Sequence, residues 1–436
     1  MTVSDTRIGA LEELRWRGLI ALSTDEEALT AAVAAGPVTY YCGFDPTAPS
    51  LHIGNLLQLL TMRRLQDAGH RPLALVGGAT GLIGDPRMSG ERVLNDRDTV
   101  AGWVEEIRRQ VERFLVFDGP VGATVVNNLD WTAPLSAIDF LRDVGKHFRV
   151  NRMLAKEAVS ARLDSEAGIS FTEFSYQILQ GMDYLELYRR HGCTLQTGGS
   201  DQWGNLTAGT DLIHRVEGVD VHLLATPLVT KADGTKFGKT ESGTVWLDGD
   251  MTSPYAFYQF WLNAEDAKVA EYLRFFTFRT REEIDELERA TRERPAAREA
   301  QRVLAADVTD LVHGAQVRQR VEEASRALFG RGDLDSLDGR ALADALAELP
   351  LARLPRREHP VVDLFAATGL VASKSAARRA VAEGGAYVNN RRIEDPDAVA
   401  GTADLLGGRW LLLRRGRRSL AAVELVGDSE DSTDAP

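Results

Sequence analysis

The chain has 436 residues, 44% of them apolar and 26% charged, so it is long enough for two or three domains with complete cores. Its formal net charge of -13 argues against indiscriminate nucleic-acid binding, while leaving room for local basic patches. No apolar run approaches the roughly 20 residues that span a bilayer and no signal-peptide pattern is present, so we expect a cytoplasmic protein without a membrane partner.

The first half of the chain alternates strand patterns with helix patterns. Continuous apolar runs are typical of buried parallel strands, and apolar residues spaced by three or four indicate helices. Thr24-Asp-Glu-Glu27 has the form of a capping box. The predicted elements are helix 8–35, strand 38–44, helix 56–69, strand 72–78, helix 100–114 and strand 124–128. This alternation predicts an α/β, doubly wound, Rossmann-like parallel sheet in residues 1–250, with ligands at the carboxyl ends of its strands.

A first motif lies at the first predicted strand-to-helix turn, in Tyr41-Cys-Gly-Phe-Asp-Pro-Thr-Ala-Pro-Ser-Leu-His-Ile-Gly-Asn55. Such a turn presents backbone N–H groups and the positive end of a helix dipole, which suit a triphosphate. His52 can donate a ring N–H to a phosphate oxygen, and Gly54 would let a flat adenine approach the main chain. We therefore expect ATP at this turn.

A glycine-rich run after the second strand, Gly77–Gly84, suggests two other nucleotide sites, but its spacing fits neither. The glycines fall at 77, 78, 81 and 84, which is not the dinucleotide-binding fingerprint. A P-loop would need Gly-Lys-Ser or Gly-Lys-Thr where this chain has Gly84-Asp-Pro86. A dehydrogenase and a P-loop ATPase are therefore disfavoured.

A longer helix is predicted after Ser170-Phe-Thr-Glu173, which has the form of a second capping box. One face of this helix is apolar, and another aligns Tyr176, Gln180 and Asp183 at i, i+4 and i+7. Taken alone, these three side chains are better explained as a solvated polar face. Gly181 in mid-helix costs about 1 kcal/mol relative to alanine, which indicates that something large packs closely there.

The second motif is Lys236-Phe-Gly-Lys-Thr240. Lys236 and Lys239 could close over the β- and γ-phosphates as charge develops on the leaving pyrophosphate, and Thr240 would add a neutral donor. An isolated K-x-x-K segment is usually a solvated loop. Together with the first motif, in this order, the segment resembles the two ATP signatures of the class I aminoacyl-tRNA synthetases.

The remainder of the chain loses the alternating pattern. The predicted parts are an α-helical domain at 251–335, a linker at 336–360, a small α+β domain at 361–426 and a disordered acidic tail at 427–436. Within the α+β domain we expect a helix at 374–383 and a hairpin formed by 410–413 and 420–426.

Two basic patches stand out in this acidic chain. Arg149, Arg152 and Lys156 fall at i, i+3 and i+7, which would place them on one face of a helix. Residues 361–420 contain ten Lys or Arg against six Asp or Glu, a net charge of +4. In isolation each patch is better explained as a solvated charged face than as an RNA site.

From about residue 8 to 426 the chain resembles the bacterial tyrosyl-tRNA synthetases. The segments that carry the resemblance are Tyr41–Asn55, Val76–Pro86, Phe171–Asp183, Gly198–Gly204 and Lys236–Asp248. The resemblance implies a tyrosine–tRNA ligase, in which the carboxylate of L-tyrosine attacks the α-phosphorus of ATP and the tyrosyl group then passes to the terminal adenosine of tRNA(Tyr). The protein's task is then positioning and stabilisation of phosphate charge.

The resemblance also implies a role for individual residues. The substrate phenol would contact Tyr41 and Asp183. The ammonium group would contact Asp85, Tyr176, Gln180 and Gln202. The implied ATP-binding residues are Cys42, Gly43, Asp45, Gly54, Asp201 and Lys239. The implied catalytic residues are Thr47, His52, Asn55, Lys236, Lys239 and Thr240. Phenylalanine would leave the groups that meet the phenol unpaired, so the pocket should select tyrosine.

The implied partners include tRNA and a second copy of the chain. The last domain resembles an S4-type RNA-binding unit. The implied tRNA contacts are Arg149, Arg152 and Lys156 for the acceptor stem and Lys374, Arg378, Arg379, Arg391 and Arg392 in the last domain. A homodimer is expected, with one tRNA spanning both subunits. Mg²⁺ is expected with ATP and has no assigned protein ligand, and Cys42 and Cys193, the only two cysteines, predict no cysteine zinc site.

One position in the first motif departs from the family pattern. Asn55 stands where the family most often has histidine; asparagine keeps an N–H donor of similar reach but carries no proton charge, and we expect activity to be retained. Arg87 and Arg92 receive no role.

A tryptophanyl-type synthetase shares the fold, but the two groups placed at the substrate phenol favour tyrosine. A non-catalytic RNA-binding protein on the same scaffold is disfavoured by the intact ATP motifs.

Overall fold

The computed structural model describes residues 9–86, 94–163, 168–240, 243–416 and 419–427. The chain forms two compact units: Met1–Met251 with Glu265–Ala300, and Thr252–Ala264 with Gln301–Pro436. Across the described ranges, no helix is both long enough and apolar enough to cross a membrane.

The first unit is built on a six-stranded sheet of order β1-β6-β5-β2-β3-β4. Its strands are β1 (Leu22–Ser23), β2 (Thr39–Phe44), β3 (Arg71–Val76), β4 (Thr124–Asn127), β5 (Cys193–Gly199) and β6 (His222–Thr226). β1 is antiparallel to β6, and the other pairs are parallel. The chain winds outward from β2 to β4 and then from β5 to β6, so the order reverses between β2 and β5. This confirms the doubly wound fold and places its ligand crevice beside these two strands.

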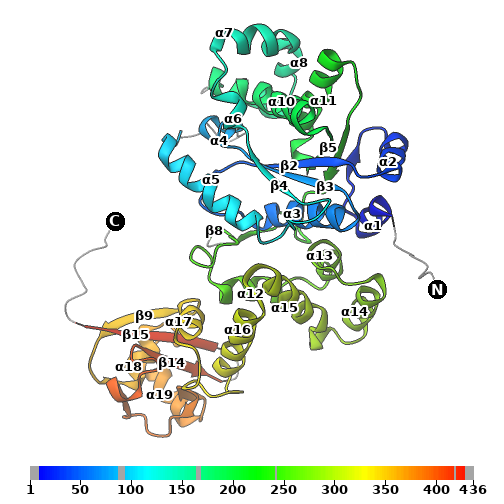
Figure 1. The fold of residues 1–436 in the computed structure, drawn as a ribbon. Helices are drawn as coiled ribbons and strands as arrows, with labels where there is room; N and C mark the ends of the chain where they lie inside the picture. The colour runs from blue at the N-terminus through cyan, green and yellow to red at the C-terminus, as the bar shows by residue number, and fades with distance from the viewer. Residues whose placement is uncertain (1–8, 87–93, 164–167, 241–242, 417–418, 428–436) are drawn as a thin grey trace. The chain divides into compact units, whose positions relative to one another are not determined.

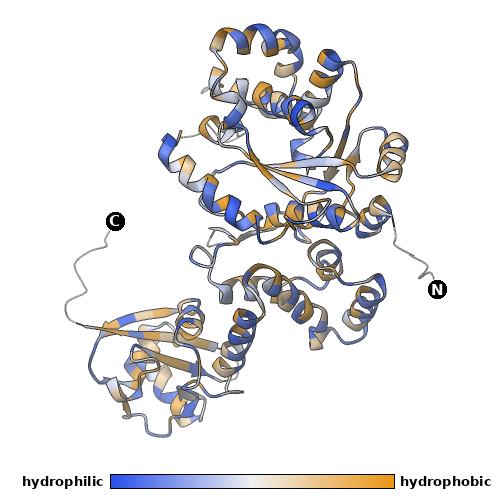
Figure 2. Cartoon of the chain, in the orientation of Figure 1, coloured by the Kyte–Doolittle hydropathy of each residue, from blue (hydrophilic) through white to orange (hydrophobic). Residues whose placement is uncertain are grey.

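Helices cover both faces of this sheet, with α3 on one face and α10 and α11 on the other (Figure 1). The helices of the unit are α1 (Ala10–Arg17), α2 (Glu26–Ala35), α3 (Ile53–Asp67), α4 (Thr80–Ile83), α5 (Arg97–Val111), α6 (Leu129–Thr132), α7 (Ala137–Asp139), α8 (Val150–Leu154), α9 (Glu157–Leu163), α10 (Phe171–His191), α11 (Trp203–Glu217), α13 (Val269–Phe276) and α14 (Arg281–Glu293). Apolar side chains of β2, β3, β5 and α10 form a common core. The helices turn mixed, largely hydrophilic faces outward (Figure 2).

The second unit combines helices with a five-stranded sheet of order β12-β11-β14-β15-β9. Its helices are α12 (Pro254–Leu262), α15 (Glu299–His313, of which the first two residues belong to the other unit), α16 (Ala315–Leu328), α17 (Gly339–Ala347), α18 (Val361–Ala367) and α19 (Lys374–Ala382). Its strands are β9 (Leu351–Pro355), β10 (His359–Pro360), β11 (Ala386–Val388), β12 (Arg391–Arg392), β13 (Val399–Ala400), β14 (Trp410–Arg415) and β15 (Ser419–Val426). The predicted helix at 374–383 and the predicted hairpin are confirmed as α19 and the β14–β15 pair.

The prediction of one helix over 8–35 is wrong. Gly18 adopts a left-handed φ of 77° and ends α1, and β1 intervenes before α2 because it pairs with the edge of β6. The predicted capping box is displaced by one residue, since Asp25 caps α2 by accepting the backbone N–H of Ala28. The Thr24 hydroxyl instead accepts the backbone N–H of Leu223.

The linker predicted at 336–360 contains regular structure instead. It holds α17, β9 and β10, and β9 pairs in parallel with β15 at the edge of the five-stranded sheet. Residues 265–300, which the sequence assigns to the helical domain, cluster with the first unit. β9 is only five residues long, has no buried position and ends at a proline, so its sequence looks like a loop.

Glycines allow α10 and α11 to lie close together. A Cβ atom on Gly181 would stand 2.9 Å from the ring of Phe148, as the mid-helix glycine suggests. A Cβ atom on Gly209 of α11 would stand 2.9 Å from Tyr184 of α10. Ser170 caps α10 by accepting the N–H of Glu173, but the Glu173 carboxylate pairs with Arg162 at 3.0 Å in a buried contact, not with the cap.

Two helical glycines therefore give opposite predictions for replacement by alanine. Gly209→Ala should lower the thermal unfolding midpoint, because an overpacking cost of about 1–3 kcal/mol outweighs a gain of about 1 kcal/mol in helix propensity. Gly102→Ala on α5, where a Cβ meets nothing within 4 Å, should raise the midpoint. Equal shifts for both variants in a melting experiment would contradict the close helix packing.

Candidate functional site

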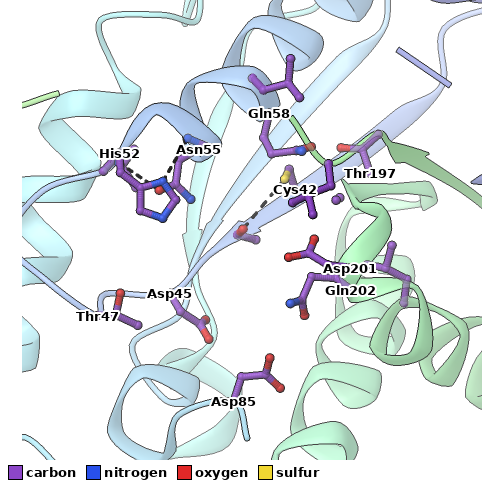
Figure 3. A pocket seen from close by; sticks show the side chains of 18 of the residues that line it. Cys42, Asp45, Thr47, His52, Asn55, Gln58, Asp85, Thr197, Asp201 and Gln202 are labelled. Atoms are coloured by element: carbon purple, nitrogen blue, oxygen red, sulfur yellow. Dashed lines mark hydrogen bonds between the residues drawn. The ribbon is translucent and has the colours of Figure 1, made fainter. Parts of the chain in front are cut away.

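A cavity of about 380 Å³ opens beside β2 and β5, where the sheet order reverses. Figure 3 shows His52 and Asn55 on one side of it and Asp201 and Gln202 on the other. The predicted site residues that line it are Tyr41, Cys42, Gly43, Asp45, Thr47, His52, Gly54, Asn55, Asp85, Tyr176, Gln180, Asp183, Asp201, Gln202 and Lys236. Lys239 and Thr240 form β7, and their side chains lie outside the described part of the structure, as do Arg87 and Arg92 altogether.

The buried carboxylate of Asp183 is held in the cavity by two donated hydrogen bonds. Its side chain is 1% exposed on α10, and its two oxygens accept Nδ2–H of Asn128 at 3.0 Å and the indole N–H of Trp131 at 2.8 Å. Burial raises the pKa of Asp183 to about 7, and the two donated hydrogen bonds oppose that rise. The carboxylate is therefore fixed in direction and poised between its two protonation states near neutral pH.

Four buried polar atoms of the cavity wall have no hydrogen-bond partner among the described residues. They are the hydroxyl of Tyr41 and the amide oxygens of Gln58, Gln180 and Gln196. A buried polar atom without a partner costs about 1–3 kcal/mol. Their concentration in one cavity indicates a ligand with several polar groups. Burial, followed by the nearby Asp183, raises the pKa of the Tyr41 phenol, which therefore stays a hydrogen-bond donor.

A second polar cluster joins Asp85 to Gln202 through a residue that the sequence did not single out. Asn205 of α11 donates from Nδ2 to Asp85 at 3.0 Å and to Gln202 at 3.1 Å. Lys156 donates to the backbone carbonyl of Gly204 and lies 3.4 Å from Oδ1 of Asn205. Burial lowers the pKa of Lys156 to about 8, although Asp85 opposes the shift.

A third cluster is centred on Asp45, just after β2. Its carboxylate accepts the hydroxyls of Thr80 at 2.6 Å and Tyr176 at 2.5 Å. A Cβ atom on Gly77 would stand 2.1 Å from Asp45, and one on Gly78 would stand 2.4 Å from Asn127. The glycine pair therefore makes room for these side chains. This close packing accounts for the glycine-rich run, and no phosphate-binding loop is needed to explain it.

The N-terminus of α3 supplies the donors on the other side of the cavity. His52 caps the helix, with Nδ1 accepting the backbone N–H of Gly54 at 3.1 Å, so its other ring nitrogen is the one that can carry a proton toward a ligand. Asn55 accepts the backbone N–H of His52 with Oδ1 at 3.1 Å, which completes a capping box. A Cβ on Gly54 would lie 2.9 Å from the His52 ring, so the glycine is needed there whether or not a ligand is bound.

Lys236 reaches the cavity from the segment after β6. Its Nζ lies 3.9 Å from the carboxylate of Asp201, and both side chains are about half exposed. The segment returns along α3, where Trp246 forms a backbone bridge with His52 and the Leu247 N–H is donated to the Leu51 carbonyl. The two sequence motifs are therefore held together by backbone hydrogen bonds.

The predicted acceptor-stem residues do not share one helix. α8 ends at Leu154 and α9 begins at Glu157, so the face predicted for Arg149, Arg152 and Lys156 is interrupted. Arg149 and Arg152 are exposed, and Arg152 lies 3.4 Å from Asp211, whereas Lys156 points to Gly204 as described above. In the second unit all the predicted RNA-binding side chains are exposed, namely Lys374, Arg378, Arg379, Arg391 and Arg392. Two of them form ion pairs: Lys374 with Asp363 at 2.9 Å and Arg378 with Asp397 at 3.4 Å.

Sequence reasoning missed the residues that hold the site from behind. Asn128 and Trp131 follow the end of β4, and this position beside a predicted carboxyl edge was a usable signal. Asn205 and Gln196 carried no comparable signal, because an isolated amide is common in helices and strands. Among the described residues, no group of three or more His, Cys, Asp or Glu could hold a metal ion.

Known proteins resemble the chain along almost its whole length. Residues 34–330 match the family model described as tRNA synthetases class I (W and Y), and residues 341–423 match the tyrosine–tRNA ligase SYY-like C-terminal domain. The tyrosine–tRNA ligase of Streptomyces avermitilis is 68% identical over 418 residues, which cover 96% of this chain and 99% of the relative. That of Streptomyces coelicolor is 66% identical with the same coverage. The crystal structure of a C-terminally truncated Aspergillus nidulans mitochondrial tyrosyl-tRNA synthetase superposes with a TM-score of 0.68 at 29% identity, covering 74% of this chain and 95% of that one.

The raised pKa of Asp183 predicts a titration that Trp131 reports. Above pH 7 the carboxylate is ionised and accepts a charge-assisted bond from the indole N–H; below pH 7 it is neutral and the bond weakens. The indole N–H resonance of Trp131 should therefore move downfield as pH rises, with a midpoint of about 7. The change should vanish in Asp183→Asn. A midpoint near that of a solvated carboxylate would contradict the account of the buried site.

Proposed function

The chain belongs to the class I tyrosyl-tRNA synthetases, and we propose that the cavity beside β2 and β5 holds tyrosine and ATP during activation. As a tyrosine–tRNA ligase, the chain joins L-tyrosine to ATP with release of pyrophosphate and transfers the tyrosyl group to the terminal adenosine of tRNA(Tyr). The observation that carries the proposed site is the unpartnered Tyr41 hydroxyl, which lines the same buried pocket as Asp183.

The phenol of tyrosine fits between these two groups. Its hydroxyl would donate to the Asp183 carboxylate and accept the O–H of Tyr41, which satisfies a buried donor at no further desolvation cost. Phenylalanine would leave both groups unpaired, and the indole of tryptophan would bring a donor without an acceptor oxygen. Selection of tyrosine therefore follows from two fixed polar groups and not from the volume of the pocket.

The ammonium end would be held by the cluster around Asn205. Asp85 supplies the negative charge, and the amide oxygens of Gln180 and Gln202 can accept ammonium hydrogens. Tyr176 donates to Asp45 and so contributes its hydroxyl oxygen as an acceptor. These contacts would aim the substrate carboxylate toward the N-terminus of α3.

ATP would lie along the start of α3 with its phosphates at the helix N-terminus. The adenosine would contact Cys42, Gly43, Asp45, Gly54 and Asp201, while the triphosphate would meet Thr47, His52, Asn55, Lys236, Lys239 and Thr240. The tyrosine carboxylate attacks the α-phosphorus in line, the bond from the α-phosphorus to the bridging oxygen of the β-phosphate breaks, and pyrophosphate leaves with that electron pair and the charge of both its phosphates. Positive groups and helix N–H donors stabilise that charge. Mg²⁺ would enter with the triphosphate, and no protein ligand is assigned to it.

The remaining proposals concern tRNA, the compartment and assembly. Exposed basic side chains in the C-terminal domain, including Arg391 and Arg392 on β12, would contact the phosphate backbone of the tRNA, and Arg149 with Arg152 would meet the acceptor stem. We place the protein in the cytoplasm, where its tRNA is.

A C₂ homodimer would bury the apolar side chains that α7 to α10 expose; these are Ile138, Leu141, Val150, Leu154, Leu163 and Phe171.

The activation step can be tested by amino-acid-dependent exchange of labelled pyrophosphate into ATP. Tyrosine should support exchange, while tryptophan and phenylalanine should not. Asp183→Ala should lower kcat/KM for tyrosine about 10- to 150-fold, because it removes a hydrogen bond to a charged group. Asp211→Ala, which removes an exposed carboxylate of α11 outside the cavity, should leave exchange unchanged. Exchange supported by tryptophan would overturn the proposed phenol pocket.

Assembly can be tested at Phe171, which is 70% exposed at the start of α10. Phe171→Asp would place two charges in a self-complementary apolar interface and should shift sedimentation from dimer to monomer. Phe329→Asp, at another exposed phenylalanine outside this face, is the control and should stay dimeric. A wild-type protein that sediments as a monomer would refute the proposed assembly.

A further inference from the structure

The segment that carries Lys236 is seated on a helix that neither ATP motif includes. Backbone hydrogen bonds fold residues 229–237 into a tight hairpin: Lys231 N–H donates to the Thr235 carbonyl at 2.8 Å and Phe237 N–H to the Val229 carbonyl at 3.0 Å. Phe237 follows Lys236 directly, so the position of its ring fixes where the lysine side chain starts. The Phe237 ring and the backbone of the hairpin both contact α13.

Tyr272 of α13 contacts both arms of the hairpin. Its ring lies against Phe237 with a centroid distance of 4.2 Å, and its hydroxyl donates to the Thr230 carbonyl at 2.9 Å. The Tyr272 side chain is 1% exposed, and its hydroxyl bond to the partly buried Thr230 carbonyl fixes one arm of the hairpin to α13. Glu265, just before α13, accepts the backbone N–H of Ala232 at 2.7 Å at the hairpin turn.

α13 is in turn fixed to the helix that carries the first ATP motif. Arg64 of α3 is buried and donates Nη2–H to the carbonyls of Phe275 and Thr277, at 3.0 Å and 2.7 Å. Arg17 of α1, also buried, donates to the carbonyls of Arg274 and Thr277 at 2.9 Å and 3.2 Å. Two cations thus cap the C-terminal carbonyls of α13, where the helix dipole favours positive charge.

A chain of contacts therefore runs from α3 through Arg64 to α13, and through Tyr272 to the hairpin of Lys236. His52 and Asn55 stand at the N-terminus of the same α3. We propose that Tyr272 is a positioning residue for tyrosine activation, which holds Lys236 at the distance from His52 that the leaving pyrophosphate requires. The inference rests on the phosphate role proposed above for Lys236, and Figure 1 shows α13 beside α3.

This arrangement separates the hairpin from the amino acid pocket. None of Tyr272, Arg64 and Glu265 lines the cavity, and tyrosine would be held by groups on β2 and α10. A change at Tyr272 should therefore affect only the step in which charge develops on the phosphates. Small displacements matter at this step, because a catalytic donor must lie within hydrogen-bond distance of the oxygen that gains charge.

The test is Tyr272→Phe, which keeps the ring on Phe237 and removes only the hydroxyl. The rate of tyrosyl-adenylate formation in rapid-quench experiments should fall about threefold to tenfold, and the reverse reaction with pyrophosphate should slow by a similar factor. The dissociation constant of tyrosine should not change. The matched control is Tyr40→Phe, which removes the hydroxyl of another buried tyrosine that donates to a backbone carbonyl, that of Met62 on α3, outside the cavity. It should leave adenylate formation at the wild-type rate, even where its melting temperature falls as much as that of Tyr272→Phe.

A double-mutant cycle with Lys236→Ala distinguishes positioning from general damage. If Tyr272 acts through Lys236, Tyr272→Phe should cause no further slowing in the Lys236→Ala background. Multiplicative effects, weaker tyrosine binding in Tyr272→Phe, or equal slowing in Tyr40→Phe would each overturn the inference. Normal activation by Lys236→Ala would remove the proposed phosphate role and this inference with it. A slow Lys236→Ala together with a wild-type Tyr272→Phe would overturn the anchoring alone.

Discussion

The buried carboxylate of Asp183 is the group around which the catalytic unit is organised. A carboxylate that is 1% exposed is costly unless its oxygens are satisfied, and Asn128 and Trp131 each donate to one of them. These donors come from the end of β4 and from α6, while Asp183 belongs to α10 on one face of the sheet. The requirement to pair this charge therefore ties the end of β4 to α10, which covers the other half of the sheet. The remaining lone pairs of the Asp183 carboxylate can then accept a hydrogen bond from a ligand in the cavity.

The doubly wound topology explains why the other site groups gather at the same place. The strand order reverses between β2 and β5. The connections that leave these two strands therefore run in opposite directions, and the crevice between them admits a substrate. α3 points its N-terminus at this crevice and α10 lays its polar face along it. One helix thus provides donors for phosphate, and the other provides acceptors and a carboxylate for the amino acid. The hairpin of Lys236 then reaches the same crevice from beyond β6, held by α13 and by the backbone of α3.

The sequence predicted the parts of this arrangement that depend on local pattern. The strand and helix periodicities located β2, β3, β4, α3, α5 and α10 to within a few residues, and the two motifs contain some of the residues that line the cavity. It could not predict properties set by packing between distant segments. The spacing predicts Lys156 on a continuous basic face, but the residue lies between α8 and α9 and its ammonium group donates to the Gly204 carbonyl. Asn205 and Tyr272 looked like ordinary helical residues because their partners are far away in the chain. The strand β9 lies within the predicted linker, because five residues that end in proline carry little pattern and their pairing partner β15 is far away in the chain.

The central claim is that two fixed polar groups, Tyr41 and Asp183, recognise a phenol. The most direct measurement is the equilibrium dissociation constant of tyrosine and of phenylalanine for the wild type, Tyr41→Phe, Asp183→Asn and the double variant, at a pH above 7. The account predicts that tyrosine binding weakens about threefold to tenfold in Tyr41→Phe and more in Asp183→Asn, with coupled effects in the double variant. Phenylalanine binding should stay constant or tighten. Parallel losses for both amino acids would contradict the account, because they would show that the two residues support the pocket without reading the hydroxyl.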